Sequence, residues 1–285
     1  MIRNLNENEF EQYIDFAYHL VLDLSKSSFP IYTDGVKDKE YFYEVARRGI
    51  ERKHHEILLF EKDDVVEGWI HYYYLEEDKY LGVNTILINN GYAQALAELL
   101  DYWKNKFAGY SWNMYLPEEN QEAISFLKEQ GYGDRGREYV NVLLFEDYIV
   151  QQNYKNVILV DKKNFELFRS VHSQFEDDMY WTSEKIEKHI ENWEIFAYAE
   201  EEKCLGAVYY NGKGEEDLEI FGIDVLDSLY KNDVIENVLI CCLNHANKSG
   251  AKSMSFFNED TFTQELAIKV GFQCKTVAHY FSEEL

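Results

Sequence analysis

The sequence predicts a mixed α/β protein built from two tandem domains of the same architecture. Strand-like and helix-like patterns of apolar residues alternate along all 285 residues, a length that permits two hydrophobic cores. The same order of elements occurs twice, and short matching motifs mark the repeat. We therefore expect an N-terminal domain over residues 1–148 and a C-terminal domain over residues 156–285, each with a mixed central sheet flanked by helices.

The first half begins with a short strand and two amphipathic helices. Apolar residues from Phe10 to Leu24 recur at helical spacing, and a second helix begins near Asp38. A hairpin, a further strand and two strand–helix alternations follow. The expected later elements are strands over 57–60, 65–74 and 80–83, a helix with its apolar face over 96–107, a strand over 111–116, a helix over 119–130 closed by Gly131, and a strand over 139–145.

The second half repeats this order. Its helical faces are apolar at the same spacing, and Gly250 and Gly271 close two of its helices. The expected elements are a strand over 157–160, helices from about 165 and 183, strands over 194–199, 204–210 and 218–225, a helical face over 235–246, a strand over 253–257, a helix over 262–270 and a strand over 276–281.

Three pairs of motifs support an internal repeat. They occur in the same order in both halves, at separations of 140, 142 and 138 residues, and small loop-length differences account for the drift. The pairs are Gly131-Tyr132 with Gly271-Phe272, Leu81-Gly82-Val83 with Ile223-Asp224-Val225, and Glu67-Gly68-Trp69 with Leu205-Gly206-Ala207.

Composition and charge exclude several classes of function. The 53 acidic and 28 basic residues give a net charge of −25, which repels phosphate backbones and anionic lipid surfaces, so we expect no nucleic-acid or membrane partner. Solubility is the ordinary explanation of this charge, and attraction of a cationic amine is the alternative. Four cysteines without CxxC spacing and no apolar run long enough to span a bilayer predict a reduced, cytoplasmic protein.

The order strand, two helices, hairpin, strand, helix, strand, helix, strand resembles the GCN5-related N-acetyltransferase (GNAT) fold. That family binds the pyrophosphate of acetyl-CoA on a loop, Gln/Arg-x-x-Gly-x-Gly/Ala, at a helix N-terminus. Residues 88–93 keep the Gly-x-Ala part as Gly91 and Ala93, whereas residues 230–235 lose every position and add Asp233. The resemblance therefore implies that acetyl-CoA binds the N-terminal domain. The implied contacts are Leu81, Val83, Asn89, Asn90, Gly91, Tyr92, Ala93, Gln94 and Asn120.

A second family segment, Asn-x-x-Ala-x-x-Phe-Tyr-x-x-x-Gly-Phe, is also matched in part. Asn120, Ala123 and Phe126 agree with it, but Leu127 stands where the family often has the tyrosine that protonates the departing thiolate. The second half, with Asp260 in place of the asparagine, lacks that hydroxyl as well. Packing of an ordinary buried helix face is an alternative explanation of the match.

Two glutamates are candidate general bases. Some members of the family carry a base six residues before the position of Val83, which gives Glu77 in the first half and Glu219 in the second. A carboxylate there can accept a proton from the acceptor amine. The alternative for Glu77 is a solvated turn, because it lies between two other acidic residues.

The resemblance implies an acetyl-CoA-dependent N-acyltransferase that acts on a small-molecule or peptide amine. The alternative is a catalytically inactive tandem GNAT-like binding or regulatory protein, favoured by the missing tyrosines and the altered second loop. We expect no metal, because His54 and His55 have no further ligand at suitable spacing. The acceptor, the acyl chain and the oligomeric state cannot be derived from the sequence.

Overall fold

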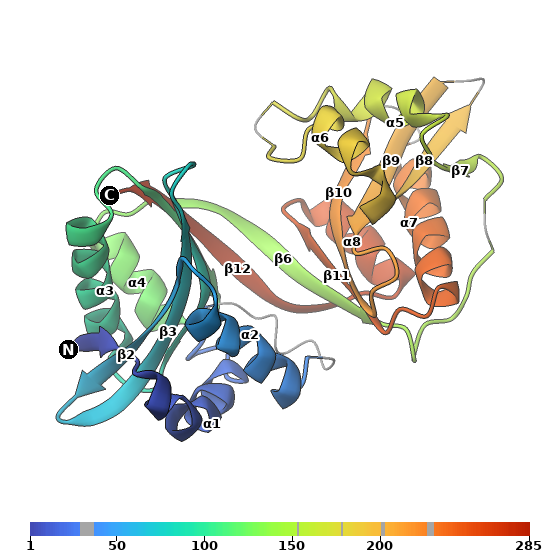
Figure 1. The fold of residues 1–285 in the computed structure, drawn as a ribbon. Coiled ribbons are helices and arrows are strands. Elements are labelled where there is room, and N and C mark those ends of the chain that lie inside the picture. The colour runs from blue at the N-terminus through green and yellow to red at the C-terminus, as the bar shows by residue number, and fades with distance from the viewer. Residues whose placement is uncertain (29–36, 153, 178, 201–202, 227–230) are drawn as a thin grey trace. The chain divides into compact units, whose positions relative to one another are not determined.

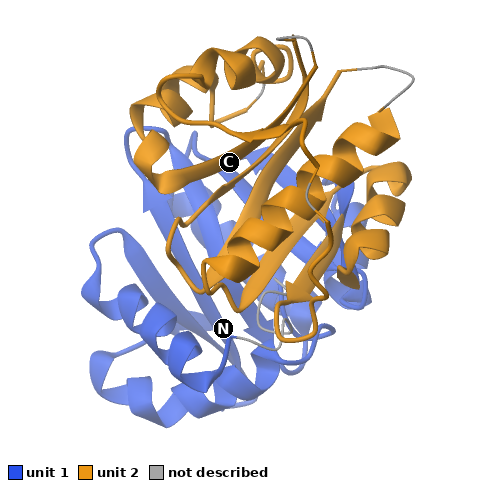
Figure 2. Ribbon diagram, turned by 90° about the vertical axis from the view of Figure 1, so that its right-hand side faces the viewer, with its two compact units in different colours: residues 1–138, 275–285 blue, residues 139–274 orange. Residues whose placement is uncertain are grey.

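The computed structural model describes residues 1–28, 37–152, 154–177, 179–200, 203–226 and 231–285. It divides into two compact units, coloured separately in Figure 2. Unit 1 comprises Met1–Glu138 and Lys275–Leu285, and unit 2 comprises Tyr139–Cys274. Among the described helices, none has the length and apolar character needed to cross a bilayer.

Unit 1 has a mixed sheet with helices packed on both faces (Figure 1). Its strands are paired in the order β1, β2, β3, β4, β5, β12, antiparallel except for the parallel pair β4 and β5. Its elements are β1 (Ile2–Asn4), α1 (Phe10–Val21), α2 (Lys39–Glu51), β2 (His55–Lys62), β3 (Val65–Leu75), β4 (Tyr80–Ile88), α3 (Tyr92–Lys106), β5 (Ser111–Pro117), α4 (Gln121–Glu129) and the start of β6 (Asp134–Leu144).

Strand alternation gives unit 1 a core on each side of the sheet. Trp69 and Leu87 point to α1 and α2, and Ile86, Trp103 and Trp112 belong to the core under α3 and α4. This division decides which residues of β4 can face a ligand on either side.

Unit 2 repeats the arrangement with strands paired in the order β6, β11, β10, β9, β8, β7. Helices α5 and α6 pack on one face and α7 and α8 on the other. The elements are β7 (Val157–Leu159), α5 (Phe165–His172), α6 (Ser183–Lys188), β8 (Trp193–Glu200), β9 (Lys203–Asn211), β10 (Asp217–Val225), α7 (Lys231–Lys248), β11 (Ser253–Asn258), α8 (Thr261–Val270) and β12 (Gln273–Glu284), whose end belongs to unit 1.

The last strands of the two repeats are exchanged. Residues 139–144 of β6 pair with β11 of unit 2, and residues 278–284 of β12 pair with β5 of unit 1. Phe281 is fully buried in the unit 1 core as a result. The compact units therefore differ from the predicted halves 1–148 and 156–285, because each unit takes its final strand from the other half of the sequence.

The internal repeat is present, with one correction to its register. Gly68 lies opposite Ile88, and Gly206 lies opposite Val225, so Gly68 and Gly206 correspond as predicted. The same pairing makes Val225 the counterpart of Ile88, and the predicted equivalence of Val225 with Val83 is wrong by five residues. A bulge lies at the same place in both hairpins, opposite the third and fourth residues after each glycine, and it supports the correspondence of Gly68 with Gly206.

Candidate functional site

In each unit a parallel pair of strands separates midway. Strands β4 and β5 are paired only from Tyr80 to Gly82 along β4, and β10 and β11 are paired only from Asp217 to Ile220 along β10. A bulge lies close to each point of separation, at Asn84 in β4 and Phe221 in β10. Beyond it, backbone N–H groups of one strand point into the gap, where they can bind an extended chain that contains amides.

In unit 1 this edge is occupied by the chain itself. The amide of Ile86 donates to Ser28 Oγ at 2.9 Å, and the amide of Ile88 donates to the carbonyl of Lys26 at 3.0 Å. Ser27 lies antiparallel to Leu87 between these two bonds. Residues 26–28, which we call the closing segment, therefore accept hydrogen bonds from the amides that β4 directs into the gap.

The predicted phosphate loop of unit 1 is also engaged. Gly91 is the N-cap of α3 and has the left-handed conformation, with φ of 83°. The amide of Ala93, which points out of the helix N-terminus, donates to Glu122 Oε1 at 3.0 Å. A carboxylate thus occupies the position that favours an anion.

Asn120 helps to hold the closing segment. Its side chain is buried, donates from Nδ2 to the carbonyl of Ser27 at 3.0 Å and caps α4 through the amide of Ala123. The Ala93 amide and the Asn120 side chain, both predicted to contact the cofactor, therefore already form hydrogen bonds within unit 1.

The remaining predicted contacts have structural roles in unit 1. Leu81 and Tyr92 are buried in the core, and the Tyr92 hydroxyl donates to the carbonyl of Ile86 at 2.7 Å. Asn89 donates to Glu67 and accepts from Lys26 Nζ, and Gln94 donates to Glu98. Val83 lies beside the point where β4 and β5 separate, and Asn90 is exposed before Gly91. Most of the predicted acetyl-CoA contacts are thus engaged within unit 1, and the acetyl-CoA site there stays a prediction.

In unit 2 the corresponding edge is not closed by a segment of the described chain. Leu226 donates its amide to Leu205 on β9, so the amides of Ile223 and Val225 point to the opposite side, where the pairing with β11 has ended at Ile220. No hydrogen bond from these two amides to another described segment is present. Unit 2 therefore offers the pair of backbone donors that unit 1 uses internally.

The corrected register also changes the second loop. Of residues 230–235, Tyr230 lies outside the described residues, and the others form the first turn of α7 rather than a loop. Asp233 is an exposed residue of that turn. Residues 231–235 are therefore helix residues and not the unit 2 counterpart of the Gly91 loop.

The two candidate bases lie in different settings. Glu77 is exposed in the turn before β4, and β4 separates it from the Gly91 loop by nine residues, about 30 Å. Glu219 is exposed on β10, two residues before the bulge at Phe221. Its neighbours Leu218 and Ile220 point into the core with α7, so Glu219 lies on the opposite face. The structure places Glu219, and not Glu77, beside a separating strand pair.

A buried pair on that same face was not predicted. His172 at the end of α5 contacts Asp224 of β10, with 2.6 Å from Nδ1 to Oδ2, and its Nε2 lies 2.8 Å from the carbonyl of Trp181. Burial lowers the pKa of His172, but the bonds to Asp224 and Trp181 raise it by more. Burial raises the pKa of Asp224 despite the contact with His172. Because both partners of the ring act as acceptors, we assign the pair as imidazolium and carboxylate.

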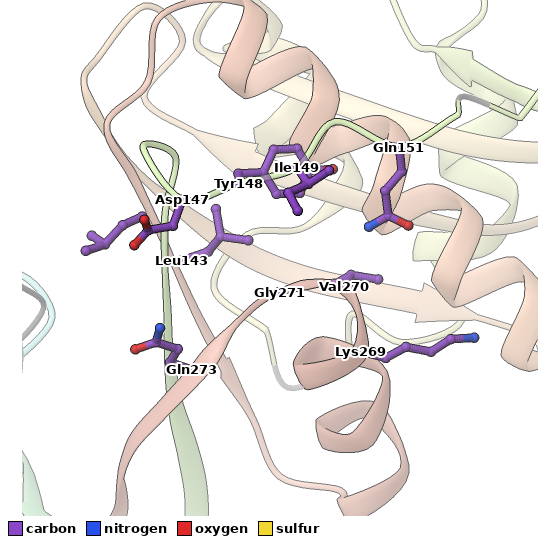
Figure 3. Close-up of a pocket in the computed structure, with 10 residues that line it drawn as sticks. Leu143, Asp147, Tyr148, Ile149, Gln151, Lys269, Val270, Gly271 and Gln273 are labelled. Atoms are coloured by element: carbon purple, nitrogen blue, oxygen red, sulfur yellow. The ribbon is translucent and has the colours of Figure 1, made fainter.

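Unit 2 also has a cavity of about 360 Å³, shown in Figure 3. Tyr148, Gln151, Lys269 and Gln273 line it together with apolar side chains. Leu144, another lining residue, pairs with Ser253 at the start of β11. Strands β10 and β11 separate at the other end, after Phe256 of β11. This cavity is therefore at the other end of the sheet from the open edge of β10.

Comparison with known proteins places this geometry in a recognised fold. No protein-family model matches the chain, and no curated protein sequence matches it. A GCN5-related N-acetyltransferase from Sphaerobacter thermophilus has a similar structure over 100% of this chain and 95% of its own, with a TM-score of 0.67 and 12% identity.

Two further structures are similar over nearly the full length of both chains. A tandem GNAT protein from the clavulanic acid biosynthesis pathway gives a TM-score of 0.52 at 12% identity over 100% of this chain and 98% of its own. A GNAT-family acetyltransferase from Colwellia psychrerythraea gives 0.51 at 11% over 99% and 100%. The chain thus has the GCN5-related N-acetyltransferase fold in tandem, which confirms the predicted fold class.

Proposed function

We propose that this chain is an acyl-CoA-dependent N-acyltransferase and that unit 2 holds the acyl-CoA. The observation that carries the proposal is the difference between the two strand edges: β4 is closed by residues 26–28, whereas Ile223 and Val225 of β10 keep their amides directed into the gap. The pantetheine arm of CoA is an extended chain with two amide groups, which suits such an edge. The fold of the structural neighbours agrees with acyl transfer.

Glu219 is the residue that we assign to proton transfer. Acyl-CoA supplies a thioester, whose carbonyl carbon is the electrophile. An acceptor ammonium must lose a proton before its nitrogen lone pair can attack that carbon, and a carboxylate near the bulge of β10 can accept it directly or through water. Formation of the C–N bond then breaks the C–S bond, and the thiolate leaves. As the amide forms, the nitrogen releases its second proton, and the thiolate can take this proton through water, so no tyrosine is needed for this step.

The test measures release of free CoA thiol with acetyl-CoA and a panel of primary amines. We expect Glu219→Gln to lower kcat/KM by about 10²–10⁴-fold, because a general base contributes a factor of this size. The loss should be largest at a pH where the carboxylate is ionised and the amine is protonated. Glu77→Gln is the matched control, since Glu77 is an exposed turn residue, and it should leave the rate unchanged.

Two results would contradict the proposal. Calorimetry that detects no acetyl-CoA binding to the wild-type protein would exclude the transferase. A collapse of activity in Glu77→Gln together with normal activity in Glu219→Gln would return the active site to unit 1.

A further inference from the structure

Unit 1 has a cavity of about 160 Å³ where β4 and β5 separate, on the face of the sheet that α1 and α2 cover. Tyr73, Tyr80 and Tyr115 form much of its wall, and Ser28, Gly82 and Asn113 also line it. We call it the tyrosine cavity. Its volume is several times the roughly 30 Å³ that one water molecule takes up in the liquid, so it can admit a group of several heavy atoms.

The position of Tyr73 depends on a glycine. Tyr73 lies opposite Gly82 in the hairpin, and a Cβ built on Gly82 would lie 2.2 Å from Tyr73 Cζ. Only the absence of a side chain lets the ring lie over β4. The Tyr80 ring is 6.2 Å from the Tyr73 ring, and Tyr115 is 5.0 Å from Tyr280, which fixes the two sides of the wall.

Three tyrosines make up much of the described lining of the cavity. Among the described residues that line the cavity there is no Asp, Glu, Lys, Arg or His. Aromatic faces carry negative potential, which attracts cations and repels anions, and the net charge of −25 acts in the same direction over longer distances.

Two of the polar atoms that line the cavity already accept hydrogen bonds. Ser28 Oγ already accepts the amide of Ile86, and the Tyr80 hydroxyl oxygen lies 3.4 Å from the Asn113 amide nitrogen that donates to it. A primary ammonium brings three donors that need acceptors, whereas a fully methylated ammonium brings none. The second type loses less when it leaves water for such a cavity.

We propose that the tyrosine cavity binds a small quaternary ammonium group. The closing segment uses the donors that a cofactor would need in unit 1, so this unit serves as a ligand-binding module rather than a second transferase. The inference does not depend on acyl transfer by unit 2, because it concerns other residues and needs no acyl-CoA.

The experiment is calorimetric titration of the full-length protein with choline and with 3,3-dimethyl-1-butanol, its neutral isostere. We expect choline to bind at least about 5-fold more tightly, since the two differ only in the charge that the rings can recognise. Equal affinities would overturn the proposal, and so would the absence of saturable choline binding up to about 10 mM, a range that already includes weak binding.

Variants identify the cavity as the site. Tyr80→Leu should weaken choline binding by about 5-fold or more, whereas Tyr80→Phe, which keeps the ring, should bind within about 2-fold of the wild type. Tyr154→Leu, at a partly exposed tyrosine of unit 2, is the matched control and should bind normally. If Tyr80→Leu fails to fold, as judged by circular dichroism, Tyr115→Leu replaces it. Unchanged affinity in the folded leucine variant would contradict the assignment.

Discussion

At the scale of single residues, the buried ion pair of His172 and Asp224 is the main electrostatic feature of unit 2. The two side chains are 0% and 4% exposed, and Glu176 adds a second carboxylate 3.7 Å from His172 Nε2. The Phe168 ring stacks on the imidazole, with the ring centroids 4.7 Å apart. Removal of one partner leaves an unpaired charge in a low-dielectric site, which typically costs about 3–5 kcal/mol.

This pair should make the stability of unit 2 depend on pH. The pKa of His172 is higher in the folded than in the unfolded chain, so its contribution is fully present below the unfolded value of about 6.5 and is lost as pH rises through the folded value. We expect the free energy of unfolding of the wild type to exceed that of His172→Phe by more at about pH 6 than at about pH 9.

Urea denaturation of both proteins at the two pH values measures this difference. Asp224→Asn provides an independent check, because it removes the charge that raises the pKa of His172. It should reduce the pH dependence even if His172→Phe is too unstable to study. A wild-type stability that rises from about pH 6 to about pH 9 relative to both variants would show that His172 is neutral in the folded protein.

At the scale of elements, the two units use the same strand separation in opposite ways. In unit 1 the edge of β4 carries bonds from Ile86 and Ile88 to the closing segment, and in unit 2 the edge of β10 carries none to the described chain. Amides held in hydrogen bonds exchange slowly with solvent, and unpaired strand edges exchange faster. Hydrogen exchange therefore reports on each edge separately.

We expect acetyl-CoA to slow exchange in peptides that cover residues 221–226 by about tenfold or more, because the amides of Ile223 and Val225 gain partners. Peptides that cover residues 85–89 should be protected with and without acetyl-CoA. Mass spectrometry of the full-length protein measures both in one sample, so unit 1 is the internal control. Protection that appears only in residues 85–89 would show that the closing segment moves away and that unit 1 holds the acyl-CoA.

Element types followed from the sequence because apolar periodicity and glycine caps are local signals. Gly131 and Gly271 end α4 and α8 with positive φ, as their positions after apolar helix faces predict. The occupation of the β4 edge carried no such signal, since residues 26–28 have no periodic pattern and their partners are about 60 residues away. His172 and Asp224 are 52 residues apart, and only the fold brings them together.

At the scale of the whole molecule, the exchange of final strands was the least predictable feature. Residues 134–144 and 273–284 are both alternating strands that follow a helix, so either could close either sheet by local pattern alone. The choice depends on pairing over long sequence distances. Tyr115 pairs with Tyr280, and Thr276 donates to Glu119, so the C-terminus completes the unit that begins at the N-terminus.

Phe281→Ala tests this arrangement. Phe281 is fully buried among core residues that include Met114 and Trp112, and loss of a buried phenylalanine typically costs about 3–5 kcal/mol. Because the lost contacts belong to unit 1, amides of β5, residues 111–117, should lose protection against hydrogen exchange, although they lie more than 150 positions before the substitution. Peptides from β8 and β9 of unit 2 should keep their protection.

If each half of the sequence kept its own last strand, the result would be reversed: unit 2 would lose protection and β5 would remain protected. Phe262→Ala, at a partly buried residue packed against the unit 2 core, is the complementary substitution and should affect unit 2 first.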